Sequence, residues 1–299
     1  MPKIEYPKIS IVTPNYNGGA FLEATIKSVL DQNYPNLEYI IIDGGSTDNS
    51  LDIISKYSDQ LSYWVSEPDN GIYHAVQKGF EKSTGEIMAW MNSDDMYATG
   101  AFSIVSEIFA KYETINWLMG IPSAYDEYGR VTHVHDLKRW SKYNYYIGDY
   151  EWIQQESVFW RKSLWVNAGS KLDLSLELAG DFELWMRFFR HEKLYTLNAL
   201  LGGFRIRSKN QLSLERLDDY RLEVEHVIAN EHHTILTKDE LEIVKKIKNY
   251  KDKGAQSHHL IRFFCNYKVK QLVKRYFNYP SLLYFDRFEQ TFKLESDAD

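Results

Sequence analysis

Polar side chains gather at three places in the first hundred residues, each directly after a run of apolar or β-branched residues. The three clusters are Thr13–Gly18, Asp43–Ser46 and Asn92–Asp95. A single carboxylate at a strand end can be explained as the cap of the next helix. Three polar strand ends in succession, two of them with carboxylates, instead indicate a ligand that offers hydrogen-bond donors and carries negative charge.

The pair Asp94-Asp95 follows the apolar run Ile87–Met91, which places it at the rim of the core. Two adjacent carboxylates repel each other unless a cation or hydrogen-bond donors compensate their charge. Mg²⁺ and Mn²⁺ take oxygen ligands and commonly combine one or two carboxylates with substrate phosphates. The pair therefore predicts a divalent ion that holds a diphosphate.

The segments that carry these clusters alternate between strand and helix patterns. Strands are predicted at 9–13, 37–43, 61–66 and 86–91, and helices at 20–32, around 51–57 and at 72–83. This order predicts an α/β fold with a mostly parallel central sheet and helices on both faces. Ligands bind beyond the carboxyl ends of the strands in such a sheet, which is where the three clusters lie.

The pattern changes in the second half of the chain. It predicts a strand at 117–121, a hairpin at 124–135, a helix at 180–191 and two strands within 193–207. After about Leu214 the pattern is continuously helical. A boundary near 210–220 is therefore expected between an α/β domain and a helical C-terminal extension.

Length and composition limit the class of protein. The chain has 299 residues and a mass of 35.2 kDa, enough for one large core or a core with an appendage. Cys265 is the only cysteine, so no intrachain disulfide can form and a reducing compartment is expected. The N-terminus has no apolar signal region, and no run approaches the ~18 apolar residues of a membrane span. We therefore expect a cytoplasmic protein.

Charge is distributed unevenly along the chain. Residues 1–214 hold 20 basic and 27 acidic residues, whereas residues 215–299 hold 15 of each. Within 243–285 there are ten basic residues and one acid, Asp252. A general nucleic-acid binder does not combine an acidic body with a basic tail, so no nucleic-acid partner is expected.

Several common enzyme motifs are absent from the sequence. No glycine-rich dinucleotide fingerprint follows the first predicted strand, and there is no P-loop. A single cysteine excludes a cysteine zinc site, and no nucleophile elbow indicates a serine hydrolase.

Four stretches, taken together, carry a resemblance to a known family. They are ISIVTPNYNGGAFLEATIKSVLDQNYPNLEYIIIDGGSTDNS, SEPDNGIYHAVQKGF, TGEIMAWMNSDDMY and AGDFELWMRF, within roughly residues 8–213. They resemble the family 2 glycosyltransferases, which have the GT-A fold. The resemblance implies an inverting enzyme that uses a nucleotide-diphosphate sugar, preferably a UDP-sugar, and Mn²⁺ or Mg²⁺. It also implies a glycan or lipid-linked glycan acceptor in cell-surface polysaccharide synthesis.

The resemblance also implies a division of the chain. The catalytic domain would cover 1–214, with a nucleotide-sugar half of about 1–121 and an acceptor half of about 122–214. The C-terminal extension would cover 215–299.

The same resemblance assigns the nucleotide site to particular residues. The nucleobase pocket would be lined by Thr13, Pro14, Asn15 and Tyr16. Asp43 would accept the imide N–H of uracil in a charge-assisted hydrogen bond. Asp94 and Asp95 resemble the Asp-x-Asp motif that holds ribose and metal, and either of them could be the direct metal ligand.

Asp181 matches the position of the general base in this family. An inverting transfer needs one carboxylate to remove the proton of the acceptor hydroxyl as that hydroxyl attacks the sugar. The alternative is that Asp181 is an ordinary N-cap of the helix that follows it.

Two residues depart from the family pattern. Many relatives have Glu where this chain has Gly180, and many have His where it has Arg207. An arginine cannot bind a metal, but its planar guanidinium can neutralise a phosphate. Lys78 could add further positive charge for the phosphates, or belong to a solvated helix face.

The acceptor site is expected between the hairpin and the helix of Asp181. Aromatic residues cluster there and form either a wall for sugar rings or the packing under a long loop: Trp140, Tyr143, Tyr145, Tyr146, Tyr150 and Trp152. Gln154, Gln155 and Trp185 are expected to contact the acceptor, and Glu156, which follows the two glutamines, could also reach acceptor hydroxyls.

The basic tail contains one amphipathic helix pattern. A single stripe would hold Ile261, Cys265, Val269, Leu272, Val273 and Tyr276, with Lys268, Lys270, Lys274 and Arg275 outside it. The stripe could pack on the catalytic domain or a second subunit, or it could dock on an anionic inner leaflet.

Two other functions remain open from the sequence. A nucleotidyl-transfer enzyme that makes sugar nucleotides could use the same sheet and metal, but it would lack a dedicated base and release pyrophosphate. An inactive relative that binds nucleotides or glycans is also compatible with Gly180 and Arg207.

Overall fold

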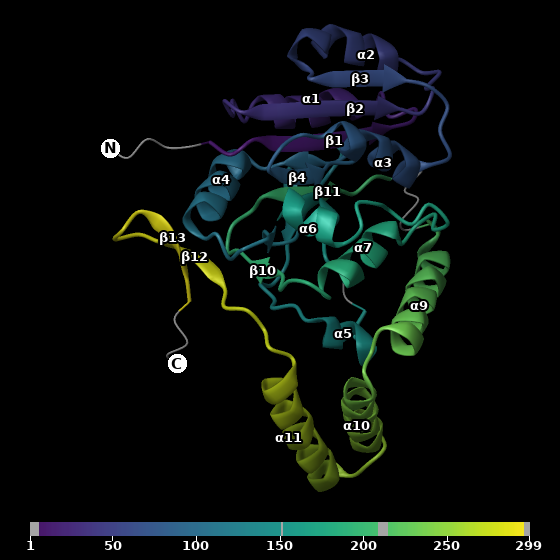
Figure 1. The fold of residues 1–299 in the computed structure, drawn as a ribbon, viewed down its shortest axis with the longest axis vertical. Helices are drawn as coiled ribbons and strands as arrows, with labels where there is room; N and C mark the ends of the chain where they lie inside the picture. Colours follow the sequence, from purple (N-terminus) through teal and green to yellow (C-terminus); the bar gives the residue numbers. More distant parts are fainter. Residues whose placement is uncertain (1–5, 151, 209–214, 296–299) are drawn as a thin grey trace.

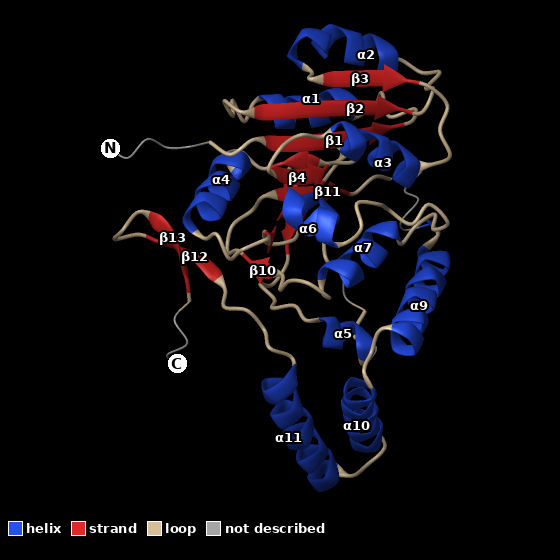
Figure 2. Cartoon of the chain, in the orientation of Figure 1, coloured by secondary structure: helices blue, strands red, loops and turns tan. Residues whose placement is uncertain are grey.

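The computed structural model describes residues 6–150, 152–208 and 215–295. Within them a seven-stranded sheet runs in the order β10-β6-β9-β4-β1-β2-β3 (Figures 1 and 2). The strands are β1 (Ile9–Asn15), β2 (Leu37–Asp43), β3 (Tyr63–Ser66), β4 (Ile87–Trp90), β6 (Trp117–Met119), β9 (Val158–Arg161) and β10 (Tyr195–Thr196). Strands β3, β2, β1 and β4 are parallel, as are β10 and β6, and only β9 is antiparallel to its neighbours.

A smaller four-stranded sheet lies beside the central one. Its order is β5-β11-β7-β8, with β5 (Met96–Tyr97), β7 (Ser123–Tyr125), β8 (Val131–Val134) and β11 (Gly202–Arg205). Strand β5 directly follows the polar cluster after β4, and β11 pairs with it antiparallel. The predicted hairpin is confirmed as the antiparallel pair of β7 and β8.

Helices cover the central sheet on both faces. They are α1 (Leu22–Leu30), α2 (Ser50–Tyr57), α3 (Ile72–Lys82), α4 (Ala101–Lys111), α5 (Lys142–Tyr146), α6 (Lys162–Asn167) and α7 (Gly180–Phe188), with short 3₁₀ turns at Ser58–Gln60 and Gln155–Ser157. Every residue of β1 is buried, although successive side chains point to opposite faces of a strand. Both faces of the sheet are therefore covered, as the sequence predicts.

Aromatic side chains fill the space between the sheet and α7. Trp185 stacks on Trp90, with 5.7 Å between ring centroids and 13° between planes, and it also contacts Trp117 and Trp160. The side chain of Trp185 is 1% exposed. This placement corrects the expected acceptor contact of Trp185, because the register of α7 turns this residue toward the sheet.

The C-terminal extension consists of α9 (Leu217–Thr234), α10 (Lys238–Ala255), α11 (His259–Tyr276) and a hairpin of β12 (Leu283–Asp286) and β13 (Thr291–Leu294). The expectation of a continuously helical tail is therefore wrong beyond α11. The hairpin buries Leu283 and Phe292, and Lys111 of α4 donates to the carbonyl of Phe292 at 2.7 Å. Tertiary contacts with the catalytic domain thus stabilise these short strands.

The predicted domain boundary after residue 214 adjoins residues 209–214, which lie outside the described residues. Within the described part of the chain, no helix has both the length and the apolar character needed to cross a bilayer.

Trp185→Ala should lower the free energy of unfolding by about 3–5 kcal/mol, because it removes a large buried side chain from a packed cluster. Urea denaturation followed by circular dichroism would measure the loss. The matched control is Trp152→Ala, since Trp152 is 53% exposed and its loss should cost less than about 1 kcal/mol. Equal losses in the two variants would contradict the core placement of Trp185.

Candidate functional site

The carboxyl ends of β1 and β2 bring the first two polar clusters together. Asn15 and Asp43 are partners in the parallel register, and Asn15 Nδ2 donates to Asp43 Oδ1 at 2.7 Å. Asp43 also accepts from the hydroxyls of Ser46 and Ser66 and from two backbone N–H groups. Burial opposes the charge of Asp43, but these hydrogen bonds hold its pKa below the ordinary value. Asp43 is thus a buried anion that organises the loop after β2.

The other residues predicted for the nucleobase pocket differ in exposure. Thr13 is buried and its hydroxyl lies 3.1 Å from that of Tyr39, and Pro14 is buried in β1. Tyr16 is 68% exposed at the rim of the cluster. The Oδ1 atom of Asn15 is buried and has no hydrogen-bond partner among the described residues. An unpaired buried acceptor of this kind is expected where a ligand supplies the missing donor.

The two carboxylates after β4 occupy different environments. The side chain of Asp94 is 20% exposed, and its Oδ2 lies 3.1 Å from Nη2 of Arg207. Asp95 is 1% exposed, and its Oδ1 accepts from the backbone N–H of Arg205 at 2.7 Å. Burial raises the pKa of Asp94, an effect that the charge of Arg207 opposes. Burial and then the charges of Asp94 and Glu156 raise the pKa of Asp95 well above its ordinary range.

Arg205 was not predicted as a site residue, and Glu156 was expected near the acceptor hydroxyls rather than in this cluster. Burial raises the pKa of Glu156 to about 7, and Glu156 interacts electrostatically with Asp94, Asp95 and Asp181. Arg205 is 1% exposed, and its Nε donates to the carbonyl of Asp94 at 2.5 Å. One feature of the sequence could have indicated Arg205. It lies two residues before Arg207 in a predicted strand, and this spacing places both side chains on one face of the strand.

Asp181 lies in the first turn of α7. The helix begins at Gly180 and its N-cap is Ala179, so the alternative of an N-cap role for Asp181 is wrong. The Tyr73 hydroxyl lies 3.4 Å from Asp181 Oδ1. Burial raises the pKa of Asp181 to about 6. A carboxylate whose pKa lies near neutrality is well suited to accept and release a proton.

The glycine before Asp181 has a steric explanation. A Cβ atom at Gly180 would lie 2.7 Å from the ring of Tyr73, which is closer than carbon atoms approach. The Tyr73 ring therefore fills the space that a larger side chain at 180 would need. The departure from the family pattern at Gly180 leaves Asp181 in place and brings a tyrosine hydroxyl close to it.

Lys78 and the two glutamines have partners within the protein. Lys78 Nζ pairs with Glu67 at 2.7 Å. Gln154 bonds both the N–H and the carbonyl of Ser123, and Gln155 donates to the carbonyl of Trp90. The Oε1 atom of Gln155 is buried without a partner in the described part of the chain. The amide of Gln154 is thus occupied by the backbone, whereas Gln155 retains one acceptor.

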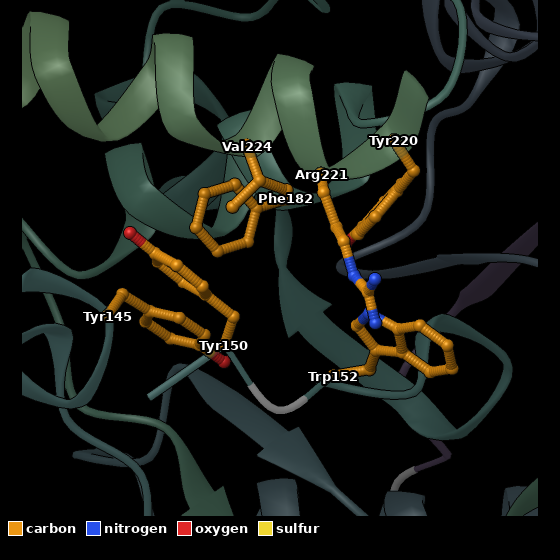
Figure 3. A pocket seen from close by; sticks show the side chains of 7 residues that line it. All are labelled: Tyr145, Tyr150, Trp152, Phe182, Tyr220, Arg221 and Val224. Atoms are coloured by element: carbon orange, nitrogen blue, oxygen red, sulfur yellow. The ribbon is translucent and has the colours of Figure 1, made fainter. Parts of the chain in front are cut away.

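A pocket of about 70 Å³ opens beside α7 (Figure 3). Its lining comes from the predicted aromatic cluster, from α7 and from α9: Tyr145, Tyr150, Trp152, Phe182, Tyr220, Arg221 and Val224. Tyr220 and Asp181 interact electrostatically, so the pocket adjoins the first turn of α7. Tyr150 and Trp152 are 40% and 53% exposed. The volume is too small to enclose a sugar, but a ring can rest on these aromatic faces.

The rest of the predicted aromatic cluster is packing. Trp140, Tyr145 and Tyr146 are buried, and Trp140 and Tyr145 stack with 11° between their planes. The cluster therefore divides into a buried part and an exposed part formed by Tyr150 and Trp152.

The carboxylate of Asp94 could bind a divalent ion, but this part of the site offers few other oxygen ligands. The Asp95 carboxylate is buried, and Arg207 already pairs with Asp94. Among the described residues, no group of three or more His, Cys, Asp or Glu side chains is arranged to hold a metal. The donor set fits an ion that takes most of its ligands from a bound diphosphate and water.

Solved structures with similar folds include Staphylococcus aureus TarS 1–349 in complex with UDP-GlcNAc. It aligns with a TM-score of 0.65 and 16% identity over 89% of this chain and 81% of that one. The same TarS fragment has also been solved in complex with UDP, with a TM-score of 0.62 and 15% identity over 85% of this chain and 77% of that one. These likenesses show the GT-A fold.

Curated relatives are found by sequence as well. An uncharacterised glycosyltransferase of Rickettsia typhi is 25% identical over 229 residues, which is 72% of this chain and 69% of that protein. The putative teichuronic acid biosynthesis glycosyltransferase TuaG of Bacillus subtilis is 36% identical over 94 residues, 30% of this chain and 37% of that protein. The model of glycosyl transferase family 2 matches residues 10–168, more than half of the chain. The chain therefore belongs to glycosyl transferase family 2.

Proposed function

We propose that this chain transfers a sugar from a UDP-sugar to a hydroxyl group of a glycan or lipid-linked glycan, with inversion at the anomeric carbon. The observation that carries the proposal is the position of Asp181, a carboxylate of raised pKa, beside the acidic cluster after β4. The polar ends of β1 and β2 adjoin that cluster, because β1 lies between β2 and β4. Donor, base and acceptor would thus meet at one edge of the sheet.

The proposed chemistry needs one proton acceptor. Asp181 takes the proton of the acceptor hydroxyl while the oxygen of that hydroxyl attacks the anomeric carbon. The bond between the anomeric carbon and the UDP oxygen breaks in the same step. Attack from the face opposite the leaving group inverts the configuration. The Tyr73 hydroxyl donates to the carbonyl of Leu178 at 2.7 Å and lies 3.4 Å from the Asp181 carboxylate, so it fixes the segment that leads into α7. A pKa of about 6 leaves Asp181 mostly ionised at neutral pH, ready to accept the proton.

The leaving diphosphate needs positive charge. Arg207 forms an ion pair with Asp94, and its guanidinium can turn toward a phosphate when the diphosphate binds. A divalent ion held by Asp94 would supply further charge stabilisation to the leaving group when bound. Asp95 is better suited to hold the backbone of the β11 strand, since its Oδ1 accepts from Arg205.

A UDP-sugar donor is favoured by Asp43 and by the ligands of the TarS structures, which are UDP and UDP-GlcNAc. Both oxygens of Asp43 already accept hydrogen bonds, including those of Ser46 and Ser66. Uracil would therefore reach Asp43 by replacing one hydroxyl donor, and Ser66 is the one whose departure leaves the β2 loop intact.

A saccharide acceptor is favoured by the exposed aromatic faces of Tyr150 and Trp152, in the pocket that Phe182 of α7 also lines. Sugar rings present C–H groups that stack on such faces. A role in cell-surface polysaccharide synthesis agrees with the name of the relative TuaG.

Asp43→Asn should weaken UDP binding by roughly 1.5–3 kcal/mol, because it replaces a charged acceptor with a neutral amide. Isothermal calorimetry with UDP and Mn²⁺ measures the difference. Asp52→Asn, at an exposed position on α2, serves as the control and should bind like the parent. If the Asp43 variant bound UDP as tightly as the parent, Asp43 would not belong to the nucleotide site.

Asp181→Asn should slow transfer by roughly 10²–10⁴-fold and leave UDP-sugar affinity unchanged, since only the base is lost. The measurement is UDP release from a panel of UDP-sugars, with and without Mn²⁺. Asp94→Asn is the contrasting variant and should weaken metal-dependent donor binding. Pyrophosphate as the product would favour a nucleotidyl-transfer enzyme, and binding without turnover by the parent would favour an inactive relative.

The raised pKa of Asp181 also predicts a stability effect. The folded chain binds its proton with a pKa of about 6 and the unfolded chain with a pKa of about 3.8, so stability falls as pH rises through this interval. The loss at pH 7 is at most about 3 kcal/mol, from 1.36 kcal/mol per pKa unit. Asp181→Asn should therefore be more stable than the parent at pH 7 and equal to it near pH 4, in urea denaturation at both values. A stability difference independent of pH would contradict the raised pKa.

A further inference from the structure

Helix α11 carries apolar residues on two sides. One side is the predicted stripe, and its centre, Cys265, is 1% exposed and packs beside Gly254 at the end of α10. The burial of Cys265 favours packing as the role of the predicted stripe. The stripe packs on α10, which belongs to the same C-terminal extension.

The second apolar side of α11 has no cover among the described residues. It consists of Leu260, Phe263, Phe264 and Tyr267, which are 81%, 69%, 52% and 51% exposed. We call these four residues the outer stripe. Their spacing of three and four residues places them on one face of the helix. Single exposed apolar residues are common on protein surfaces, but four on one helical face mark a contact site.

The position of the outer stripe in the fold suits a contact with an extended surface. Helices α10 and α11 lie side by side as a hairpin that projects away from the central sheet (Figure 1). The outer stripe occupies the first half of α11, next to the turn that joins the two helices. The apolar residues therefore lie at the far end of the projection.

The charge around the outer stripe is entirely positive on α11. The helix has no acidic residue and five basic ones: Arg262, Lys268, Lys270, Lys274 and Arg275. Lys268 lies over the ring of Phe264, with 5.3 Å from Nζ to the ring centroid. From Lys245 onward α10 adds five lysines, all on the same hairpin, against one acid, Asp252.

This charge decides between the possible occupants of the outer stripe. A second copy of the chain would place two such basic helices against each other, and their like charges would repel. An anionic lipid surface attracts them, and aromatic and leucine side chains insert into the boundary between headgroups and acyl chains. We propose that the α10–α11 hairpin binds an anionic membrane surface, with the outer stripe inserted and the lysines among the lipid headgroups. The proposal does not depend on the donor or the acceptor of the transfer reaction.

The test is sedimentation of the full chain with vesicles of phosphatidylglycerol and phosphatidylcholine. The parent should bind vesicles that contain phosphatidylglycerol and not pure phosphatidylcholine, and binding should weaken as salt rises. Phe263→Ser with Phe264→Ser should lower the partition coefficient at least tenfold. Lys270→Gln with Lys274→Gln should lower it roughly 25-fold, since each basic residue contributes a factor of about five.

The matched control is Tyr128→Ser with Phe288→Ser. These aromatic residues are 84% and 100% exposed on other surfaces, and their loss should not change binding. Circular dichroism shows whether each variant is folded.

Sedimentation velocity without lipid tests whether a second copy of the chain covers the outer stripe instead. A parent dimer that Phe263→Ser with Phe264→Ser converts to a monomer, without vesicle binding by the parent, would overturn the proposal. Equal binding of the parent to neutral and anionic vesicles would also overturn it.

Discussion

The structure of the site depends on how several carboxylates are compensated at one edge of a buried sheet. Arg205 is bonded to this part of the site at several points. Its backbone N–H binds Asp95, its Nε binds the carbonyl of Asp94, and its Nη1 reaches the carbonyls of Asp126 and Glu127 at 3.0 and 3.1 Å. One buried side chain thus ties the loop after β4 to the hairpin of β7 and β8. Removing this side chain would leave the carbonyls of Asp94, Asp126 and Glu127 without its donors and would take one positive charge away from the two carboxylates.

The α/β half of the fold could be predicted because its signals are local. Each predicted strand from 9 to 91 overlaps a strand of the structure, since buried parallel strands are continuous apolar runs. Strand β9, at Val158–Arg161, was not predicted. It enters the sheet antiparallel between β4 and β6, and only contacts between distant segments determine that position. The β12–β13 hairpin was missed for the same reason.

The same distinction applies to the candidate site: residues with a local sequence signal could be predicted, and residues whose role depends on tertiary contacts could not. Asp43, Asp94 and Asp181 were singled out from their positions at element ends and from the family resemblance, and their roles remain predictions. Glu156 could not be ranked in the same way, because its raised pKa arises from burial and from the charges of Asp181 and Asp94, two residues distant in the sequence. Trp185 was misassigned because its sequence neighbours resemble a motif, whereas its side chain lies in the core.

The C-terminal extension is part of the architecture of the site as well as an appendage. Glu223 of α9 accepts hydrogen bonds from the backbone N–H groups of Glu177, Leu178 and Ala179, the residues that lead into α7 and Asp181. At the other end of α9, the buried carboxylate of Glu231 accepts from Tyr146 at 2.9 Å and pairs with Arg190. Both ends of α9 are therefore fixed to the catalytic domain by charged hydrogen bonds, which are stronger than neutral ones. A chain cut after residue 214 would lose these bonds and leave three backbone donors before Asp181 without their carboxylate, so the position of Asp181 depends on residues beyond the predicted domain boundary.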